Sequence, residues 1–166
     1  LFAYRQVKPI DPVLVRCYLE GLLKTFIFSL FIIVGTLLSV NLVPAAPLEA
    51  LFIWFSLWCL GLGAGLIFSA FAGLVPEVGI VLRIISMPLL IISGVILPLN
   101  FIPYDYLAYV MWNPIVHGLE SLRAAFFPMY RTVEGSSLIY LWYWALSMIT
   151  LGLMLHLRFE LKLKRQ

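Results

Sequence analysis

Residues 25–48 read TFIFSLFIIVGTLLSVNLVPAAPL and contain no charged side chain, with Lys24 before them and Glu49 after them. Crossing the hydrocarbon core of a bilayer, which is roughly 30 Å thick, takes about 20 helical residues. The stretch is long enough for that crossing. Its apolar residues do not alternate with polar ones, and it is far longer than a membrane barrel strand of about 10 residues. We therefore predict a transmembrane helix here.

Three further apolar stretches have a similar character: Ala50 to about Pro76, Ile84 to Pro98, and Ser136 to Leu157. The second of these needs residues 78–82 to reach full length. The whole chain is 63% hydrophobic and 11% charged, whereas soluble domains have about 45–50% apolar and about 25% charged residues. We predict an all-α membrane protein with four transmembrane spans, each contained in one helix; the predicted helices are residues 12–48, 50–76, 78–98 and 136–157.

Four crossings place both ends of the chain on one side of the membrane. Cytoplasmic segments of membrane proteins carry an excess of Lys and Arg. With both ends in the cytoplasm, only Arg123 and Arg131 lie outside. The inner side then holds nine cations: Arg5, Lys8, Arg16, Lys24, Arg83, Arg158, Lys162, Lys164 and Arg165. We predict that orientation, with residues 158–166 as a basic cytoplasmic tail close to anionic lipid head groups.

The outer segment, residues 99–135, is long and apolar but is interrupted by proline. Asn113 and Pro114 are typical of a helix N-cap and first helical residue, and Pro128 would end that helix. The segment predicts a re-entrant pair of short helices that dips into the outer membrane surface. Backbone breaks at that depth are tolerated only against protein or a water-filled cavity, so we expect a gating or lining role.

His117, Glu120 and Arg123 recur every three residues along one face of this second short helix. They resemble catalytic groups or metal ligands, but Glu120 and Arg123 at i,i+3 are spaced to pair with each other. We interpret them as a polar lining or a structural pair, and we predict no catalytic residue and no metal site. The centres of the spans hold no ionisable group of the kind that a proton-coupled transporter needs. The energy source is therefore expected in another protein.

Other motifs exclude further classes of function. Residues 61–65, GLGAG, lack the GK[ST] ending of a phosphate loop, follow no strand and lie inside a span. Glycines there are expected to let helices approach closely. Cys17 and Cys59 lack metal-ligand spacing and are interpreted as small apolar residues. No basic run interleaved with aromatics indicates nucleic-acid binding.

Residues 1–11 form a cytoplasmic segment before the first span. Asp11 predicts an N-cap and Pro12 a first helical turn, and the following Arg16, Glu20 and Lys24 recur every four residues as an ion-pair ladder. The aromatic and cationic side chains ahead of Asp11 suit either a groove in a partner protein or anchoring at the membrane surface. Because the chain opens inside this polar connector, we expect its natural N-terminus to be missing.

Three motifs carry a resemblance to a known family: LFAYRQVKPID at 1–11, WNPIVHGLESLR at 112–123 and FPMY at 127–130. They resemble the permease (transmembrane) subunit of type-2 ABC exporters, in the capsular polysaccharide export family. The resemblance extends over essentially the whole chain. It implies six spans in the full protein, two of them ahead of residue 1.

The resemblance also implies the partners and the roles of particular residues. A separate ABC ATPase subunit would bind ATP and Mg, leaving this chain without a cofactor. A second permease copy would complete a homodimer that moves a lipid-linked polysaccharide across the inner membrane, with periplasmic and outer-membrane export proteins as further partners. The ATPase-coupling role falls on Phe2, Tyr4, Arg5, Val7, Lys8 and Pro9. The outer gate and translocation path fall on Tyr106, Tyr109, Asn113, Pro114, His117, Glu120 and Arg123.

Two alternatives stay open at this point. The same machinery exports O-antigen, teichoic acid or drugs, and apolar span residues do not identify the cargo. A membrane scaffold without transport is the other alternative, although a scaffold would not depend on an ATPase partner.

Overall fold

The computed structural model describes residues 8–40, 42–95, 99 and 104–163. Within these residues every regular element is a helix. Three of the helices, α1, α2 and α6, are long and apolar enough to cross a membrane, so the chain is a multi-pass α-helical membrane protein. The helices are α1 (Asp11–Leu37), α2 (Pro47–Leu74), α3 (Pro76–Ile92), α4 (Tyr104–Val110), α5 (Pro114–Phe126), α6 (Leu138–Arg158) and α7 (Glu160–Leu163).

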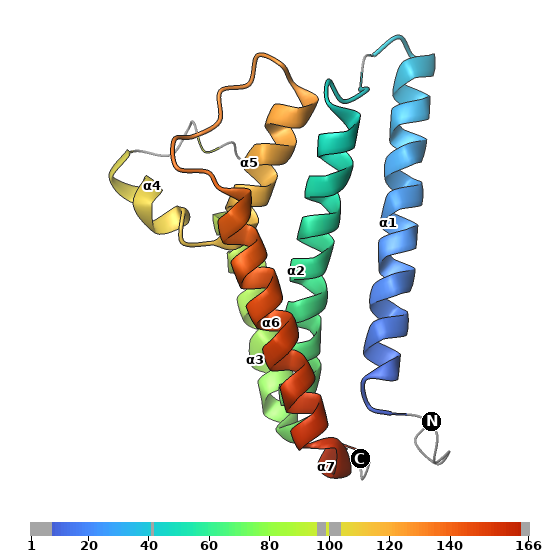
Figure 1. Cartoon of the computed structure of the whole chain (residues 1–166), viewed down its shortest axis with the longest axis vertical. Helices are drawn as coiled ribbons and strands as arrows, with labels where there is room; N and C mark the ends of the chain where they lie inside the picture. Colours follow the sequence, from blue (N-terminus) through green and yellow to red (C-terminus); the bar gives the residue numbers. More distant parts are fainter. Residues whose placement is uncertain (1–7, 41, 96–98, 100–103, 164–166) are drawn as a thin grey trace.

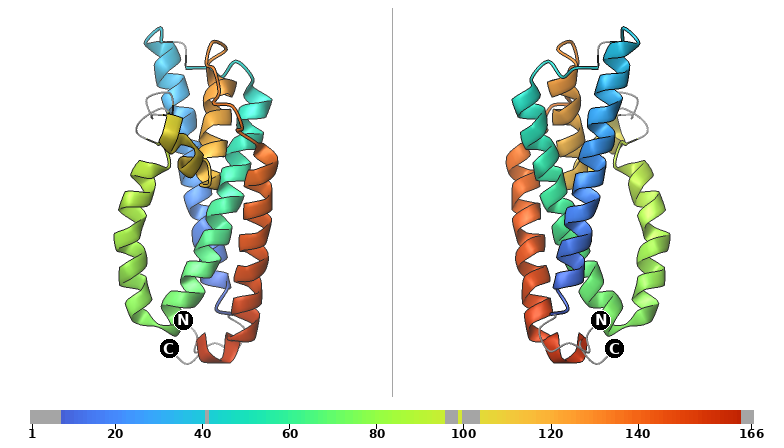
Figure 2. Two further views of the ribbon diagram at one scale, coloured as in Figure 1. Left: turned by 90° about the vertical axis from the view of Figure 1, so that its left-hand side faces the viewer. Right: turned by 90° about the vertical axis from the view of Figure 1, so that its right-hand side faces the viewer.

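Helix α2 is the centre of the bundle and contacts α1, α3, α5, α6 and α7. Helix α1 begins and α6 ends at the same end of the bundle, while α4 and α5 lie toward the other end (Figure 1). Helix α3 folds back from α2 and runs along a different flank from α6 (Figure 2). The buried apolar core lies where α2 meets α6 and α5, around Ile53, Leu60, Leu141 and Ala125.

Glycines allow α2 and α6 to approach closely. A Cβ atom on Gly63 of α2 would lie 2.8 Å from the Met148 Cβ and 2.9 Å from the backbone nitrogen of Ile149 on α6. A Cβ on Gly152 of α6 would lie 2.5 Å from the Leu66 Cβ. Small residues at helix crossings are how membrane helices gain van der Waals contact, because lipid supplies no hydrophobic force between them. The predicted role of the glycines at 61–65 in close packing is therefore confirmed at Gly63, but it is wrong at Gly61 and Gly65, where an added Cβ would meet open space.

The first helix was predicted to end at residue 48, but α1 ends at Leu37. Ser39 takes a positive φ of 60°. The amide of Val40 donates to the Gly35 carbonyl at 2.8 Å, and the amide of Ser39 donates to the Thr36 carbonyl at 3.1 Å. These two bonds form a Schellman motif, which satisfies the last helical carbonyls and turns the chain out of the helix. Apolar composition alone did not reveal this end, because residues 38–48 are as apolar as the helix.

The start of α1 also differs by one residue from the prediction. Ile10 occupies the N-cap position, and Asp11 is the first helical residue. The Asp11 carboxylate instead accepts a hydrogen bond from the backbone amide of Lys8 at 2.8 Å. Of the predicted ion-pair ladder, the structure shows Arg16 and Glu20, whose charged atoms lie 3.8 Å apart.

Helix α3 covers 17 residues, with Pro88 inside it. It begins at Pro76, just before the predicted start at residue 78, and it ends at Ile92, short of the predicted end at residue 98. Gly94 follows in a turn with a φ of +75°, a conformation that glycine adopts without strain and that ends the helix. Because crossing a bilayer takes about 20 helical residues, the predicted fourth crossing stays a prediction.

The outer segment folds into the two predicted short helices, α4 and α5. Helix α4 descends toward the middle of the bundle and α5 climbs back beside α2 (Figure 1). Helix α5 ends at Phe126, with Pro128 following as predicted. Their position relative to the membrane surface stays a prediction.

His156, near the end of α6, is a buried polar residue. Its side chain is 4% exposed, and its Nε2 lies 3.1 Å from the Leu66 carbonyl oxygen on α2. A carbonyl oxygen can only accept, so Nε2 carries the proton. This bond fixes the C-terminal end of α6 against α2, and α7 follows directly after it.

Candidate functional site

Helix α5 positions the polar side chains at the end of the bundle where α4 and α5 lie. Asn113 is its N-cap, and the Asn113 Oδ1 accepts a hydrogen bond from the Ile115 amide at 3.1 Å. Pro114 is the first helical residue, where a missing N–H costs nothing. The predicted start of this helix is confirmed.

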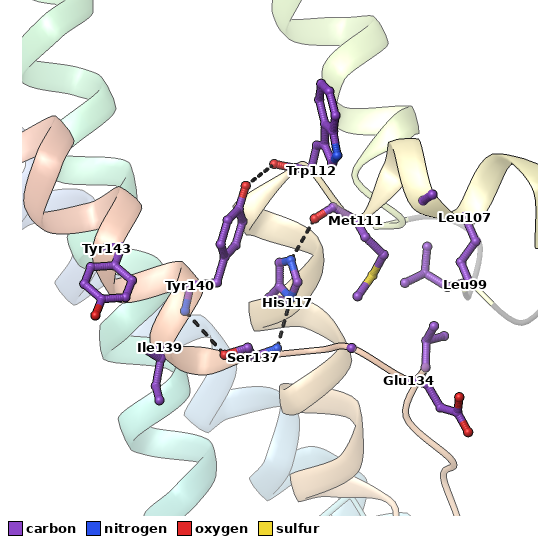
Figure 3. Close-up of a pocket in the computed structure, with 13 residues that line it drawn as sticks. Leu99, Leu107, Met111, Trp112, His117, Glu134, Ser137, Ile139, Tyr140 and Tyr143 are labelled. Atoms are coloured by element: carbon purple, nitrogen blue, oxygen red, sulfur yellow. Dashed lines mark hydrogen bonds between the residues drawn. The ribbon is translucent and has the colours of Figure 1, made fainter.

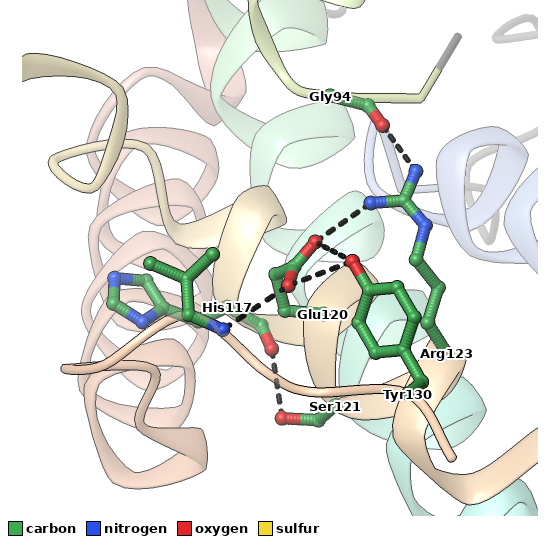
Figure 4. Close-up of polar contacts among 7 residues, drawn as sticks. Gly94, His117, Glu120, Ser121, Arg123 and Tyr130 are labelled. Atoms are coloured by element: carbon green, nitrogen blue, oxygen red, sulfur yellow. Dashed lines mark hydrogen bonds and ion pairs between the residues drawn. The ribbon is translucent and has the colours of Figure 1, made fainter. Parts of the chain in front are cut away.

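The carboxylate of Glu120 is completely buried. Arg123 donates to it from Nη1 at 2.8 Å, which confirms the predicted i,i+3 pair. The Tyr130 hydroxyl lies 2.9 and 3.0 Å from its two oxygens, and the Val133 amide donates at 3.4 Å (Figure 4). A buried charge is tolerated when it is paired and its remaining lone pairs are satisfied. These donors meet that requirement from two segments of the chain.

Arg123 extends this cluster to the end of α3. Its second guanidinium nitrogen donates to the carbonyl oxygen of Gly94, the buried turn residue after α3 (Figure 4). The guanidinium has several donors in one plane, so one side chain joins Glu120 on α5 to the α3 turn. We call Glu120, Arg123, Tyr130 and Gly94 the Glu120 cluster. It ties together α5, the turn after α3 and the loop before α6.

The Glu120 cluster also determines the acidity of Tyr130. Burial raises the pKa of the Tyr130 hydroxyl above its ordinary value, and the hydrogen bond to the Glu120 carboxylate raises it further. A proton on this hydroxyl is needed for donation to the carboxylate. The tyrosine therefore acts here as a neutral hydrogen-bond donor.

His117 forms a second set of contacts, one turn before Glu120. Its Nε2 lies 2.8 Å from the Met111 carbonyl oxygen, and its Nδ1 lies 3.0 Å from the Ser137 amide. The carbonyl can only accept and the amide can only donate. The imidazole is therefore neutral with its proton on Nε2. Because both ring nitrogens are engaged, His117 is a structural link between the α4–α5 turn and the start of α6, and it has no lone pair left for a metal.

A groove of about 1020 Å³ opens beside His117, between α4 and the beginning of α6. Tyr140 and Tyr143 lie on its α6 side, and Leu107 and Met111 lie across from them (Figure 3). The Tyr140 hydroxyl donates to the Trp112 carbonyl at 3.0 Å, which fixes that ring next to His117. Of the residues that the structure describes, no three His, Cys, Asp or Glu side chains gather as a metal site would require.

The structure brings only part of the predicted site together. Asn113, Pro114, His117, Glu120 and Arg123 all belong to the α5 region. Tyr106 and Tyr109 lie on α4 with exposed side chains and belong neither to the Glu120 cluster nor to the lining of the groove. Among the predicted coupling residues, Lys8 and Pro9 lie just before α1, whereas Phe2, Tyr4, Arg5 and Val7 lie outside the described residues.

Sequence reasoning missed several residues of the site. Tyr130 and Gly94 complete the Glu120 cluster, Ser137 holds His117, and Tyr140 borders the groove. Tyr130 was seen only as part of a motif. A buried glutamate with one local partner could have suggested that further donors exist, but nothing in the spacing indicated which residues supply them.

The fold and the Glu120 cluster define a multi-pass helical membrane protein in which buried polar contacts hold α5 in place. Residues 3–127 match the family described as ABC-2 type transporter. The matched range is well over half of the chain, and the chain belongs to this family.

The chain is also similar to individual members of this family. The chain is similar to the polysialic acid transport protein KpsM of Escherichia coli, with 37% identity over 156 residues, covering 94% of this chain and 60% of the relative. It is also similar to the capsule polysaccharide export inner-membrane protein BexB of Haemophilus influenzae, with 27% identity over 127 residues, 76% of this chain and 48% of the relative. The corresponding protein CtrC of Neisseria meningitidis is 28% identical over 131 residues, with the same two coverages. The chain thus spans about half to three fifths of the length of these relatives.

Proposed function

We propose that this chain is the membrane permease of an ATP-driven exporter that moves a lipid-linked capsular polysaccharide across the bacterial inner membrane. The observation that carries this proposal is the family membership together with 37% identity to a polysialic acid transport protein along nearly the whole chain. Two further relatives are named as capsule polysaccharide export inner-membrane proteins.

The distribution of charge supports an external energy source. In α2 the only charged side chain is Glu49, in the first turn. In α6 the ionisable side chains nearest the apolar centre are Tyr140, Tyr143 and His156, near the two ends. A proton-driven transporter needs ionisable groups deep within its spans. ATP hydrolysis by a separate ABC ATPase subunit, which would bind ATP and Mg, supplies the energy in this proposal, and the chain itself carries no cofactor.

The topology in this proposal has four crossings, with α3 as the shortest, and both ends in the cytoplasm. The start of α1 and the end of α6 lie at one end of the bundle, which supports an even number of crossings (Figure 1). Helices α4 and α5 then form the re-entrant pair at the outer surface. The Glu120 cluster holds α5 of this pair against the turn after α3 and the loop before α6, so we assign to it the positioning of an outer gate. Tyr106, Tyr109, Asn113, Pro114 and His117 complete that gate.

The inner end provides the coupling to the ATPase. Residues Phe2, Tyr4, Arg5, Val7, Lys8 and Pro9 dock on the ATPase, whose closure on ATP moves α1 and opens the path. Only Gly21 and Gly35 of α1 are buried. This wide apolar surface supports contact with further membrane helices, including those of a second permease copy. Export proteins of the periplasm and outer membrane would receive the polymer.

The coupling proposal predicts an effect of charge reversal. The double substitution Arg5→Glu and Lys8→Glu should weaken co-purification of the ATPase at least about tenfold, since it places carboxylates where cations are proposed to face the partner. Membrane insertion should be unchanged, and Arg16→Glu on the exposed face of α1 is the matched control. Undiminished co-purification of the double variant would refute the docking assignment.

Deletion of the full-length gene in its native host tests the function as a whole. We expect polysaccharide to disappear from the cell surface and to accumulate inside the cell, and chemical analysis of the retained polymer then identifies the cargo. Unchanged surface polysaccharide would refute capsule export.

A further inference from the structure

The groove between α4 and α6 has a chemistry that the gating role does not use. Its volume of about 1020 Å³ is at the upper end of the range of about 300–1,000 Å³ for small-molecule sites. Such sites combine apolar and aromatic walls with a few polar groups that fix the ligand's orientation. The groove has both kinds of lining.

Aromatic side chains present flat surfaces to the groove. Trp112 is 76% exposed and Tyr143 is 69% exposed, although both line a concave surface. Between them, Tyr140 is held by its hydroxyl bond to the Trp112 carbonyl and by its contact with the His117 ring, with centroids 4.7 Å apart. Rigid aromatic surfaces with polar tips bind amphipathic ligands at a low cost in conformational entropy.

The polar groups of the groove are uncharged or negative. Ser137 and the exposed Glu134 lie on its lower side in the view of Figure 3. Among the described residues that line the groove, none is Lys or Arg. A carboxylate accepts hydrogen bonds from hydroxyl groups but repels a carboxylate or phosphate on a ligand. The groove therefore favours ligands that are rich in hydroxyl groups and carry no negative charge.

We propose that this groove binds neutral sugar units of the polysaccharide as it leaves the permease, with Trp112 and Tyr143 stacking on sugar rings and Glu134 accepting from their hydroxyls. This inference rests on the proposed export function and adds the chemical class of sugar that the outer end contacts. A lipid chain fits less well, because it would leave the Glu134 carboxylate beside hydrocarbon without a hydrogen-bond donor.

The test uses the full-length permease with its ATPase in lipid nanodiscs, and saturation-transfer NMR with two probes of equal length. One probe is a neutral oligosaccharide of N-acetylglucosamine, and the other is an acidic oligosaccharide of sialic acid. We expect the neutral probe to bind and the acidic probe to bind at least about tenfold more weakly. Tyr143→Ala and Trp112→Ala should each weaken neutral binding about tenfold, which equals about 1.4 kcal/mol. Tyr18→Ala, which removes an exposed tyrosine of α1, is the matched control.

A charge change separates binding chemistry from damage to the fold. Glu134→Lys should reverse the preference, because the lysine attracts the acidic probe, and a folding defect would not produce a gain. Equal binding of both probes by the unaltered protein, or no binding of the neutral probe at about 10 mM, would overturn the proposal. A third measurement follows the fluorescence of Trp112 in brominated lipid. If the lipid quenches this fluorescence and added neutral sugar does not restore it, the groove is a lipid site and the proposal is overturned.

The groove and the export function can fail separately. If gene deletion removes surface polysaccharide but the neutral probe does not bind, only the groove assignment is wrong. If deletion leaves surface polysaccharide unchanged, the export function is wrong, whatever the probes show.

Discussion

Replacing Glu120 by glutamine is the sharpest perturbation of the Glu120 cluster. The side chain keeps its size but loses its charge, so the Arg123 guanidinium loses the partner that lies 2.8 Å away. Removing one member of a buried ion pair destabilises proteins by about 3–5 kcal/mol. Arg123 is 20% exposed and retains the Gly94 carbonyl. We therefore expect the low end of that range, about 3 kcal/mol.

Thermal unfolding of the full-length protein in nanodiscs measures this loss. For a chain of this size, each kcal/mol lowers the midpoint by about 2–4 °C, so Glu120→Gln should lower it by about 6–12 °C. The matched control is Glu20→Gln, which also breaks an Arg–Glu pair on a helix. That pair is 3.8 Å apart and largely exposed, and exposed pairs contribute about 0–1 kcal/mol.

A double-mutant cycle shows whether the pair itself is responsible. Glu120→Gln, Arg123→Gln and the double variant should be non-additive by at least about 1 kcal/mol, because the second change removes a charge that the first leaves unpaired. The proposed role of the pair is refuted if the free-energy changes of the two single variants add to within about 0.5 kcal/mol. It is also refuted if the unfolding midpoint of Glu120→Gln is no lower than that of Glu20→Gln. Either result would show that the Glu120 cluster does not hold α5 in place.

Three other predictions follow from packing, topology and acidity. Gly152→Val should destabilise the bundle by about 1–3 kcal/mol through overpacking, because a Cβ there would lie 2.5 Å from a side-chain carbon of α2. Its control is Gly61→Ala, which has open space around it. That variant should be neutral or slightly stabilising in the same unfolding assay. A cysteine in place of Met129, which is 96% exposed, should react with an impermeant thiol reagent only from outside. A cysteine in place of Leu161 should react only from the cytoplasm. If each cysteine reacts from the opposite side instead, the proposed topology is inverted. Because the pKa of Tyr130 is raised in the folded protein, its contribution to stability is complete below the ordinary tyrosine pKa of about 10 and is lost as the pH rises through the folded pKa. Tyr130→Phe should therefore flatten the alkaline fall in stability, and an unchanged slope in unfolding midpoints above pH 10 would contradict this assignment.

Features that depend on neighbours in the sequence could be predicted. Apolar stretches of about 20 residues indicated membrane helices because lipid tolerates only segments that satisfy their own backbone hydrogen bonds. Asn113 and Pro114 indicated the start of α5, and the spacing of Glu120 and Arg123 indicated their pair. Each of these rests on contacts within one helical turn, which periodicity reveals.

Features that depend on distant segments appeared only with the tertiary structure. Gly94 lies 29 residues from Arg123, and Ser137 lies 20 residues from His117. The hydrogen bonds between Arg123 and Gly94 and between Ser137 and His117 depend on how α3, α5 and α6 pack around α2. The spacing of residues along the sequence does not indicate that packing. The end of α1 at Leu37 and the groove between α4 and α6 likewise depend on turns and crossings. Local sequence thus determined that the chain is a membrane protein in which one short helix, α5, carries polar side chains. The packing decided which groups satisfy the buried Glu120 charge, because a carboxylate removed from water takes its donors from whatever backbone and side chains the fold brings to it.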